Sequence, residues 1–197
     1  MRNASTTQLA GSPLPNTSVY AVAYRGYGAS DGTPDEAALS ADALALFDHV
    51  RSAPANRPVA LVGRSLGSGV ASYVAAHRPV DRLVLVTPFD SLAALAQSAY
   101  PLFPVRWLLH DRYESARHLA NYGGPLLIVR AGKDDIVTPP STDRLLASLA
   151  RQVPVVVLEQ AGHNDIDNDP RYASALIDYL AGSRTTSAAR QTKAEAR

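Results

Sequence analysis

The stretch VALVGRSLGSGVA, residues 59–71, decides the fold of this chain. Its apolar start, residues 59–62, predicts a buried strand, and residues 66–77 predict a helix rich in small side chains. Between them stands Ser65, flanked by glycines at the spacing Gly-x-Ser-x-Gly. A sharp turn from strand to helix exposes such a serine as a nucleophile, and the turn needs glycines because larger side chains collide with neighbouring elements.

Four further apolar runs resemble the first predicted strand. Each is predicted to be a strand that is buried on both faces: residues 19–24, 83–86, 126–129 and 155–158. Segments with helical periodicity lie between these runs, and further helices are expected over 141–151 and 170–180. Strands that alternate with helices predict an α/β fold, with a mostly parallel sheet flanked by helices.

The clearest start signal for a helix lies at residues 33–36. Thr33 is the expected N-cap, Pro34 takes the first helical position and Glu36 closes a capping box.

Two regions interrupt the alternation of strands and helices. Residues 88–122 separate two predicted strands and carry Tyr100, Phe103, Trp107 and Leu108. We expect this insertion to be a small helical lid whose apolar side chains line a substrate pocket. Residues 183–197 lack apolar periodicity and are expected to form a disordered polar tail behind one domain of residues 1–182.

Composition limits the partners. The 197 residues are 46% hydrophobic and 19% charged, with a net charge of +1, so nothing favours nucleic acid, and a small-molecule substrate is expected. The absence of cysteine excludes disulfides, thiolate metal sites and a cysteine nucleophile. No apolar run approaches the roughly 20 residues of a membrane span, and no signal peptide is recognisable, so the chain as given is expected to be cytoplasmic.

Two stretches that resemble ligand-binding loops fail in their details. Residues 25–32, RGYGASDG, place Asp31 where a dinucleotide loop needs its third glycine. Residues 165–169, DIDND, begin like a calcium loop, but Pro170 occupies the position of the required glycine. The sequence therefore predicts neither a cofactor nor a metal.

A serine nucleophile needs a general base and a group that orients that base. Four histidines lie in or beside predicted helices and are expected to be surface or packing residues: His49, His77, His110 and His118. His163 differs because it follows the strand 155–158, at the edge of the sheet where open α/β proteins place their sites. His163 is therefore the expected base.

The acid that orients the base is expected after another strand. The segment AGKDDIVTPP follows the strand 126–129 and offers Asp134 and Asp135. The chain order Ser, Asp, His is that of serine hydrolases with such an elbow. The spacing and the chain order by themselves do not decide whether Asp134 or Asp135 is the acid.

Five segments together resemble the α/β-hydrolase superfamily, in particular its Bem46-like serine hydrolases: YRGYGASDGTP, GRSLGSG, TPFDSL, AGKDDIVTPP and AGHNDI. The resemblance runs over about residues 19–180. It implies that Ser65 is the nucleophile and His163 the base. It selects Asp135 as the acid, because in similar enzymes the acid lies three residues after the glycine of this loop.

The resemblance also implies a reaction. It implies cleavage of a carboxylic ester or thioester through an acyl-enzyme, with no cofactor. Two alternatives are an acyltransferase on the same triad and a catalytically impaired binding module.

The N-terminus departs from the family pattern. Relatives carry a strand that ends in His-Gly or Gly-Gly and is followed by Asn-Ala, whereas this chain begins MRNAS. Leu66 is expected to supply one backbone N–H to the oxyanion hole and Asn3 the other. We expect an N-terminally shortened chain whose absent strand lies between residues 19–24 and 59–62, leaving inner strand edges unpaired; a longer form could be membrane-anchored.

Overall fold

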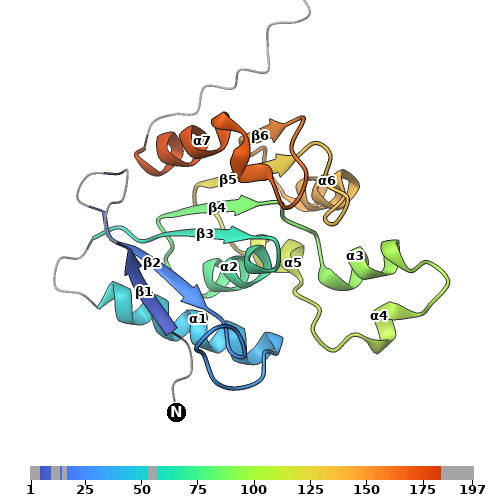
Figure 1. Ribbon diagram of the computed structural model, residues 1–197, viewed down its shortest axis with the longest axis horizontal. Coiled ribbons are helices and arrows are strands. Elements are labelled where there is room, and N and C mark those ends of the chain that lie inside the picture. The colour runs from blue at the N-terminus through green and yellow to red at the C-terminus, as the bar shows by residue number, and fades with distance from the viewer. Residues whose placement is uncertain (1–4, 10–13, 15–16, 53–56, 183–197) are drawn as a thin grey trace, which may run out of the picture.

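A four-stranded parallel sheet forms the centre of the fold (Figure 1). The computed structural model of the chain describes residues 5–9, 14, 17–52 and 57–182. The strand order is β3-β4-β5-β6, with β3 (Ala60–Arg64), β4 (Arg82–Val86), β5 (Leu126–Ala131) and β6 (Val155–Leu158). This arrangement confirms the predicted α/β class, and the carboxyl ends of all four strands meet at one edge.

Helices cover both faces of this sheet. One face packs against α1 (Glu36–Arg51), α2 (Leu66–His77), α5 (Ser115–Leu119) and α6 (Pro139–Ser148), and the other packs against α7 (Pro170–Leu180). The side chains of β4 alternate accordingly, since Leu83 and Leu85 join the first core and Val84 and Val86 the second. The two cores hold the strand ends rigidly, as a site built from several strands requires.

The predicted helices are present, with shifts at their ends. The bounds of α2 and α7 are those predicted, whereas α6 begins and ends earlier than residues 141–151. The predicted cap of α1 is wrong: Asp35 is the N-cap, and its side chain accepts from the backbone N–H of Ala38. Glu36 closes no capping box, because its carboxylate accepts from the backbone N–H of Arg112 at 2.6 Å.

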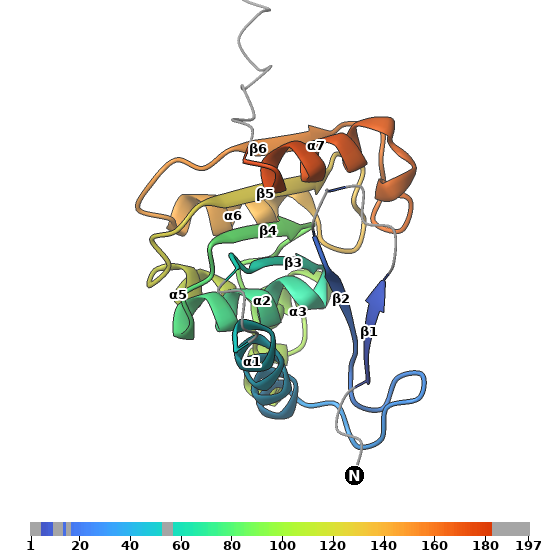
Figure 2. The same cartoon turned by 90° about the vertical axis from the view of Figure 1, so that its left-hand side faces the viewer.

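The first strands depart from the predicted single sheet. The strand β2 (Val19–Ala23) pairs antiparallel with β1 (Ser5–Leu9), and this hairpin lies beside β3 in Figure 2. Burial on both faces is wrong for β2 and β3, since Val62 in the middle of β3 is 50% exposed. The edge of β3 that faces away from β4, which was expected to lack its neighbouring strand, is unpaired within the described residues, where β3 pairs with β4 alone.

The insertion at residues 88–122 projects from the body as α3 (Leu92–Ala99) and α4 (Val105–Leu108) before α5 returns to the sheet (Figure 1). Its base is fixed, because the backbone N–H of Leu92 donates to the carbonyl of Arg112 at 2.8 Å. The carboxylate of Asp111 accepts from the backbone N–H of Glu36 on α1 at 3.1 Å. The insertion is therefore anchored to α1, while its tip extends away from the sheet.

Some predictions fall on residues outside the described part of the chain. They are the oxyanion role of Asn3, the polar tail 183–197 and the side chain of Trp107. Over the described ranges, no helix combines the length and the apolar character that crossing a membrane requires.

Candidate active site

Ser65 occupies a strained turn between β3 and α2. Its φ of 51° and ψ of −122° are sterically unfavourable for any residue but glycine. The turn is held because the N–H of Ser65 donates to the carbonyl of Val86 on β4 at 3.0 Å. Gly63 permits it, since a Cβ there would lie 2.7 Å from the Cβ of Ala71 on α2. The sharp turn predicted from the glycine spacing is confirmed.

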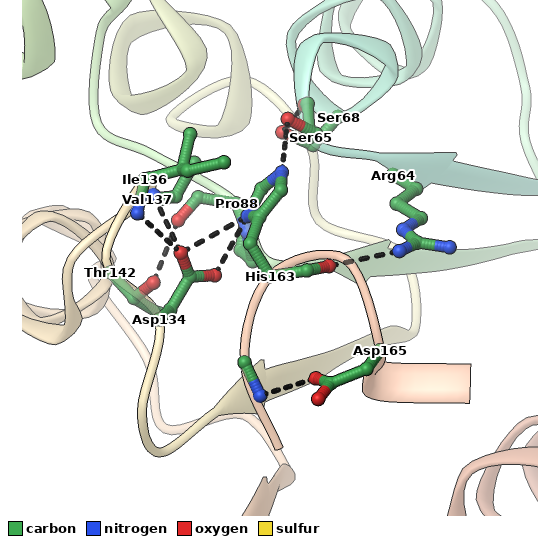
Figure 3. Close-up of polar contacts among 11 residues, drawn as sticks. Arg64, Ser65, Ser68, Pro88, Asp134, Ile136, Val137, Thr142, His163 and Asp165 are labelled. Carbon is green, nitrogen blue, oxygen red and sulfur yellow. Dashed lines mark hydrogen bonds and ion pairs between the residues drawn. The ribbon is translucent and has the colours of Figure 1, made fainter. Parts of the chain in front are cut away.

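His163 and Asp134 complete a chain of hydrogen bonds with Ser65 (Figure 3). The Nε2 atom of His163 lies 3.0 Å from Oγ of Ser65, and its Nδ1 lies 2.9 Å from Oδ2 and 3.1 Å from Oδ1 of Asp134. Both His163 and Asp134 are buried. The three residues follow β3, β5 and β6, so the parallel sheet brings together side chains that lie far apart in the sequence.

The expectation that Asp135 faces His163 is wrong. Asp135 is exposed, whereas the carboxylate of Asp134 turns inward, where its Oδ1 accepts from the backbone N–H groups of Ile136 at 3.0 Å and Val137 at 2.7 Å. This tight turn after β5 lets Asp134 use the rest of its acceptor capacity on His163. Asp134, the alternative that the sequence pattern left open, is therefore the residue that contacts His163.

The loop that carries His163 is held at several points. The backbone N–H of Gly162 donates to Oδ1 of Asp165 at 2.6 Å, which closes a small turn around His163. Nη2 of Arg64 donates to the carbonyl oxygen of His163 at 2.9 Å (Figure 3). The 3₁₀ helix η1 (Ile166–Asn168) follows, and Asp167 on it lies 3.6 Å from Nη1 of Arg64. Arg64 was not among the predicted site residues.

With this geometry established, comparison with known proteins assigns the family. Residues 13–115, just over half of the chain, match the family described as serine aminopeptidase, S33. The chain belongs to the serine aminopeptidase S33 family. An uncharacterised protein of Mycobacterium tuberculosis is 41% identical over 144 residues, which cover 72% of this chain and 51% of that protein.

A further similarity is to a lipase. The lysophosphatidylserine lipase ABHD12 of Macaca fascicularis is 34% identical over 145 residues, 64% of this chain and 36% of the lipase. The chain thus spans about half the length of the mycobacterial relative and about a third of the lipase.

Solved structures of hydrolases share the fold. A serine hydrolase homologue from Coxiella burnetii superposes with a TM-score of 0.63 at 20% identity, covering 82% of this chain and 68% of that chain. A monoacylglycerol lipase from Paleococcus ferrophilus superposes with a TM-score of 0.59 at 17% identity, covering 84% of each chain. At these identities the likeness establishes the α/β-hydrolase fold of this S33-family chain.

Leu66, the expected oxyanion donor, is the first residue of α2. The first N–H groups of a helix have no partner within the helix and lie at the positive end of its dipole. The backbone of Leu66 thus directly follows Ser65 with an N–H suited to a developing negative charge. A second donor from Asn3 stays a prediction.

The predicted pocket side chains of the lid are open to solvent. Tyr100 is 60% exposed, Phe103 63% and Leu108 70%, and the neighbouring Leu102 is 93% exposed. These side chains lie at the end of α3, in the connection to α4 and at the end of α4, and they are exposed instead of lining the expected substrate pocket. A surface hollow lined by residues of 146–153 lies beyond the end of α6, at the edge of the sheet opposite to Ser65.

His77 and His118 lie apart from Ser65. His77 ends α2, twelve residues after Ser65, or about 18 Å along the helix. Its ring lies 4.2 Å from that of Tyr73 between ring centroids, and His118 on α5 lies 5.1 Å from the same tyrosine. Burial lowers the pKa of His118, which fits a packing role. No cluster of metal-ligating side chains occurs in the described part of this chain.

Proposed function

We propose that this S33-family chain is a serine hydrolase that cleaves a carboxylic ester or thioester through an acyl-enzyme. One observation carries the proposal: the hydrogen-bonded series from Ser65 through His163 to Asp134. A serine hydroxyl is a weak nucleophile by itself, and a base within hydrogen-bond reach is what activates it. The Bem46-like motifs and the lipase among the relatives support the same reaction class.

In the first half-reaction, Oγ of Ser65 attacks the carbonyl carbon while Nε2 of His163 takes its proton. Asp134 keeps the remaining imidazole proton on Nδ1 and stabilises the imidazolium. When the tetrahedral intermediate collapses, the bond to the leaving group breaks and the imidazolium returns the proton to the departing alcohol or thiol. The product of this step is an acyl-enzyme on Ser65.

In the second half-reaction, water replaces the alcohol. His163 takes a proton from the attacking water, and the acid leaves as Ser65 recovers its proton from the imidazolium. In both steps the negative carbonyl oxygen accepts from the N–H of Leu66. Removing one oxyanion donor typically costs about 10²- to 10³-fold in rate, so the proposed second donor from Asn3 affects the rate of hydrolysis strongly.

We propose substrates with an apolar acyl chain. The side chains of Tyr100, Leu102, Phe103 and Leu108 offer an apolar surface on the insertion that follows β4. A relative is named as a lysophosphatidylserine lipase, and a lysophospholipid is such an ester. Lysophosphatidylserine is therefore the first natural substrate class to test.

Hydrolysis of p-nitrophenyl esters from acetate to dodecanoate, and of lysophosphatidylserine, tests the proposal. The purified chain is expected to release p-nitrophenol, with a preference for longer acyl chains, and Ser65→Ala is expected to reduce the rate to background. Added alcohols reveal an acyltransferase, because esters of the alcohol then replace the free acid. A folded chain that binds these esters without turnover would instead be a binding module.

A further inference from the structure

Arg64 links the nucleophile strand to the loop of the base. It is the last residue of β3 and immediately precedes Ser65. Its guanidinium donates to the main-chain carbonyl of His163 at 2.9 Å, a contact across 99 positions of sequence. Figure 3 shows this contact on the side of His163 that faces away from Asp134. His163 is thus held on one side at its ring and on the other side at its main chain.

The position of residue 64 in the strand explains why its side chain reaches this loop. Arg64 pairs in register with Val86, and Val86 belongs to the core on the α7 face of the sheet. Side chains alternate between faces along a strand, so Gly63 faces α2 and Arg64 faces the side of α7. The loop of His163 leads into η1 and α7 on that face.

The contact of Arg64 with Asp167 contributes little to folding. Its atoms are 3.6 Å apart, and the two side chains are 37% and 55% exposed, so solvent screens the attraction. The bond to the carbonyl oxygen is directional and charge-assisted, which makes it better suited to fixing a position. The hydrogen bond from Gly162 to Asp165 also stabilises this loop, but both of its partners belong to the loop itself. It therefore does not connect His163 to the strand that carries Ser65.

We propose that Arg64 is a positioning residue for the reaction: it fixes the main chain of His163 so that Nε2 stays within reach of Oγ of Ser65. The inference rests on the proposed function. Because Arg64 and Ser65 are consecutive, the same strand end carries the nucleophile and sets the place of its base. Displacement of a reacting group by about 1 Å can cost on the order of 100-fold in rate.

Three variants test this role. Arg64→Met keeps most of the apolar stem and removes every donor, and is expected to lower kcat about 10- to 100-fold with KM changed less than about twofold. Arg64→Lys retains one charged donor and is expected to recover a large part of kcat. Arg78→Met is the matched control, because it removes an arginine paired with Asp48 at 2.6 Å on the surface, and it is expected to leave kcat unchanged.

Hydrogen exchange of the peptide that spans 161–168 gives a readout independent of turnover. We expect faster exchange in Arg64→Met than in the wild type, and no change in Arg78→Met. Wild-type kcat and wild-type exchange in Arg64→Met would overturn the inference, as would an effect confined to KM, which indicates substrate contact. If the folded wild type hydrolyses nothing, the proposed function fails, and the exchange measurement alone still decides whether Arg64 fixes the loop.

Discussion

Oδ2 of Asp134 lies 2.9 Å from Nδ1 of His163, while its neighbour Asp135 points into solvent. The backbone N–H groups of Ile136 and Val137 hold Oδ1 of the Asp134 carboxylate, so its orientation does not depend on His163 alone. An anchored carboxylate is what keeps an imidazole in one tautomer during proton transfer.

Asp134→Asn and Asp135→Asn separate the two aspartates. The amide of Asp134→Asn offers Nδ1 a donor in place of an acceptor and favours the wrong tautomer, so kcat is expected to fall about 10³- to 10⁴-fold. Asp135→Asn is the matched control, with kcat expected within about twofold of the wild type. Steady-state ester hydrolysis measures both, and the reverse order of effects would assign the acid to Asp135.

Backbone strain at Ser65 predicts that glycine stabilises this position. Both Ser65→Gly and Ser65→Ala lack the nucleophile, but glycine relieves a conformation that costs about 1–3 kcal/mol in other residues. After the entropic cost of glycine, about 1 kcal/mol remains, and Tm of Ser65→Gly is expected about 2–4 °C above that of Ser65→Ala. At Ser98, inside α3, the order is expected to reverse, with alanine more stable than glycine. Thermal unfolding followed by circular dichroism measures both pairs, and equal Tm values at Ser65 would argue against strain.

The close approach of α2 to β3 makes Gly63 sensitive to a single methyl group. Gly63→Ala places a Cβ 2.7 Å from that of Ala71, and such overpacking costs about 1–3 kcal/mol, or about 3–10 °C in Tm. Gly123→Ala is the control, because its added Cβ meets no described heavy atom within 4 Å, and a change of about 1 °C or less is expected. Unchanged Tm in Gly63→Ala would show that the helix can shift without cost.

The lowered pKa of Asp90 is expected to make the folded state less stable in acid. Burial by itself raises the pKa of Asp90, but hydrogen bonds from Arg144 and Ser141 outweigh it, so the pKa lies below its usual value of 3.8. The folded state therefore binds this proton less readily than the unfolded state. The contribution of ionised Asp90 to the free energy of unfolding is complete above the pKa of Asp90 in the unfolded state, and it is lost as pH falls through the pKa in the folded state.

Urea unfolding of the wild type and Asp90→Asn between pH 7 and 3 measures this contribution. We expect the wild type to be more stable by about 1 kcal/mol at pH 7, and the difference to shrink below about pH 4. A constant difference for Asp90→Asn across the whole range would contradict the assigned pKa direction.

Local patterns predicted most of the elements in the fold. Apolar runs located β4, β5 and β6, and the glycines around Ser65 located the elbow, because these features depend on residues adjacent in sequence. The exposure of a side chain depends on which helices and strands pack over it, and a local sequence pattern does not contain this information. Val62 therefore lies in an apolar run that predicts burial, but it is half-exposed in the structure.

Details fixed by distant contacts could not be predicted in this way. The adjacent residues Asp134 and Asp135 differ in the direction in which the turn after β5 points their side chains. The number of residues that separate each aspartate from the loop glycine, Gly132, does not reveal this direction. Glu36 resembled a capping-box residue, but its carboxylate binds the backbone of Arg112, 76 positions away. The contact from Arg64 to His163 spans a still longer separation and has no local signal.

Labelling with a fluorophosphonate, read by intact mass and peptide mapping, tests the central claim most directly, because the probe reacts with a serine only when a base activates it. One adduct on Ser65 is predicted for the wild type and Asp135→Asn, none for Ser65→Ala, and strongly slowed labelling for Asp134→Asn. Folded wild-type protein that takes up no probe, or an adduct that persists in Ser65→Ala, would contradict the assignment of Ser65, His163 and Asp134 as a working triad.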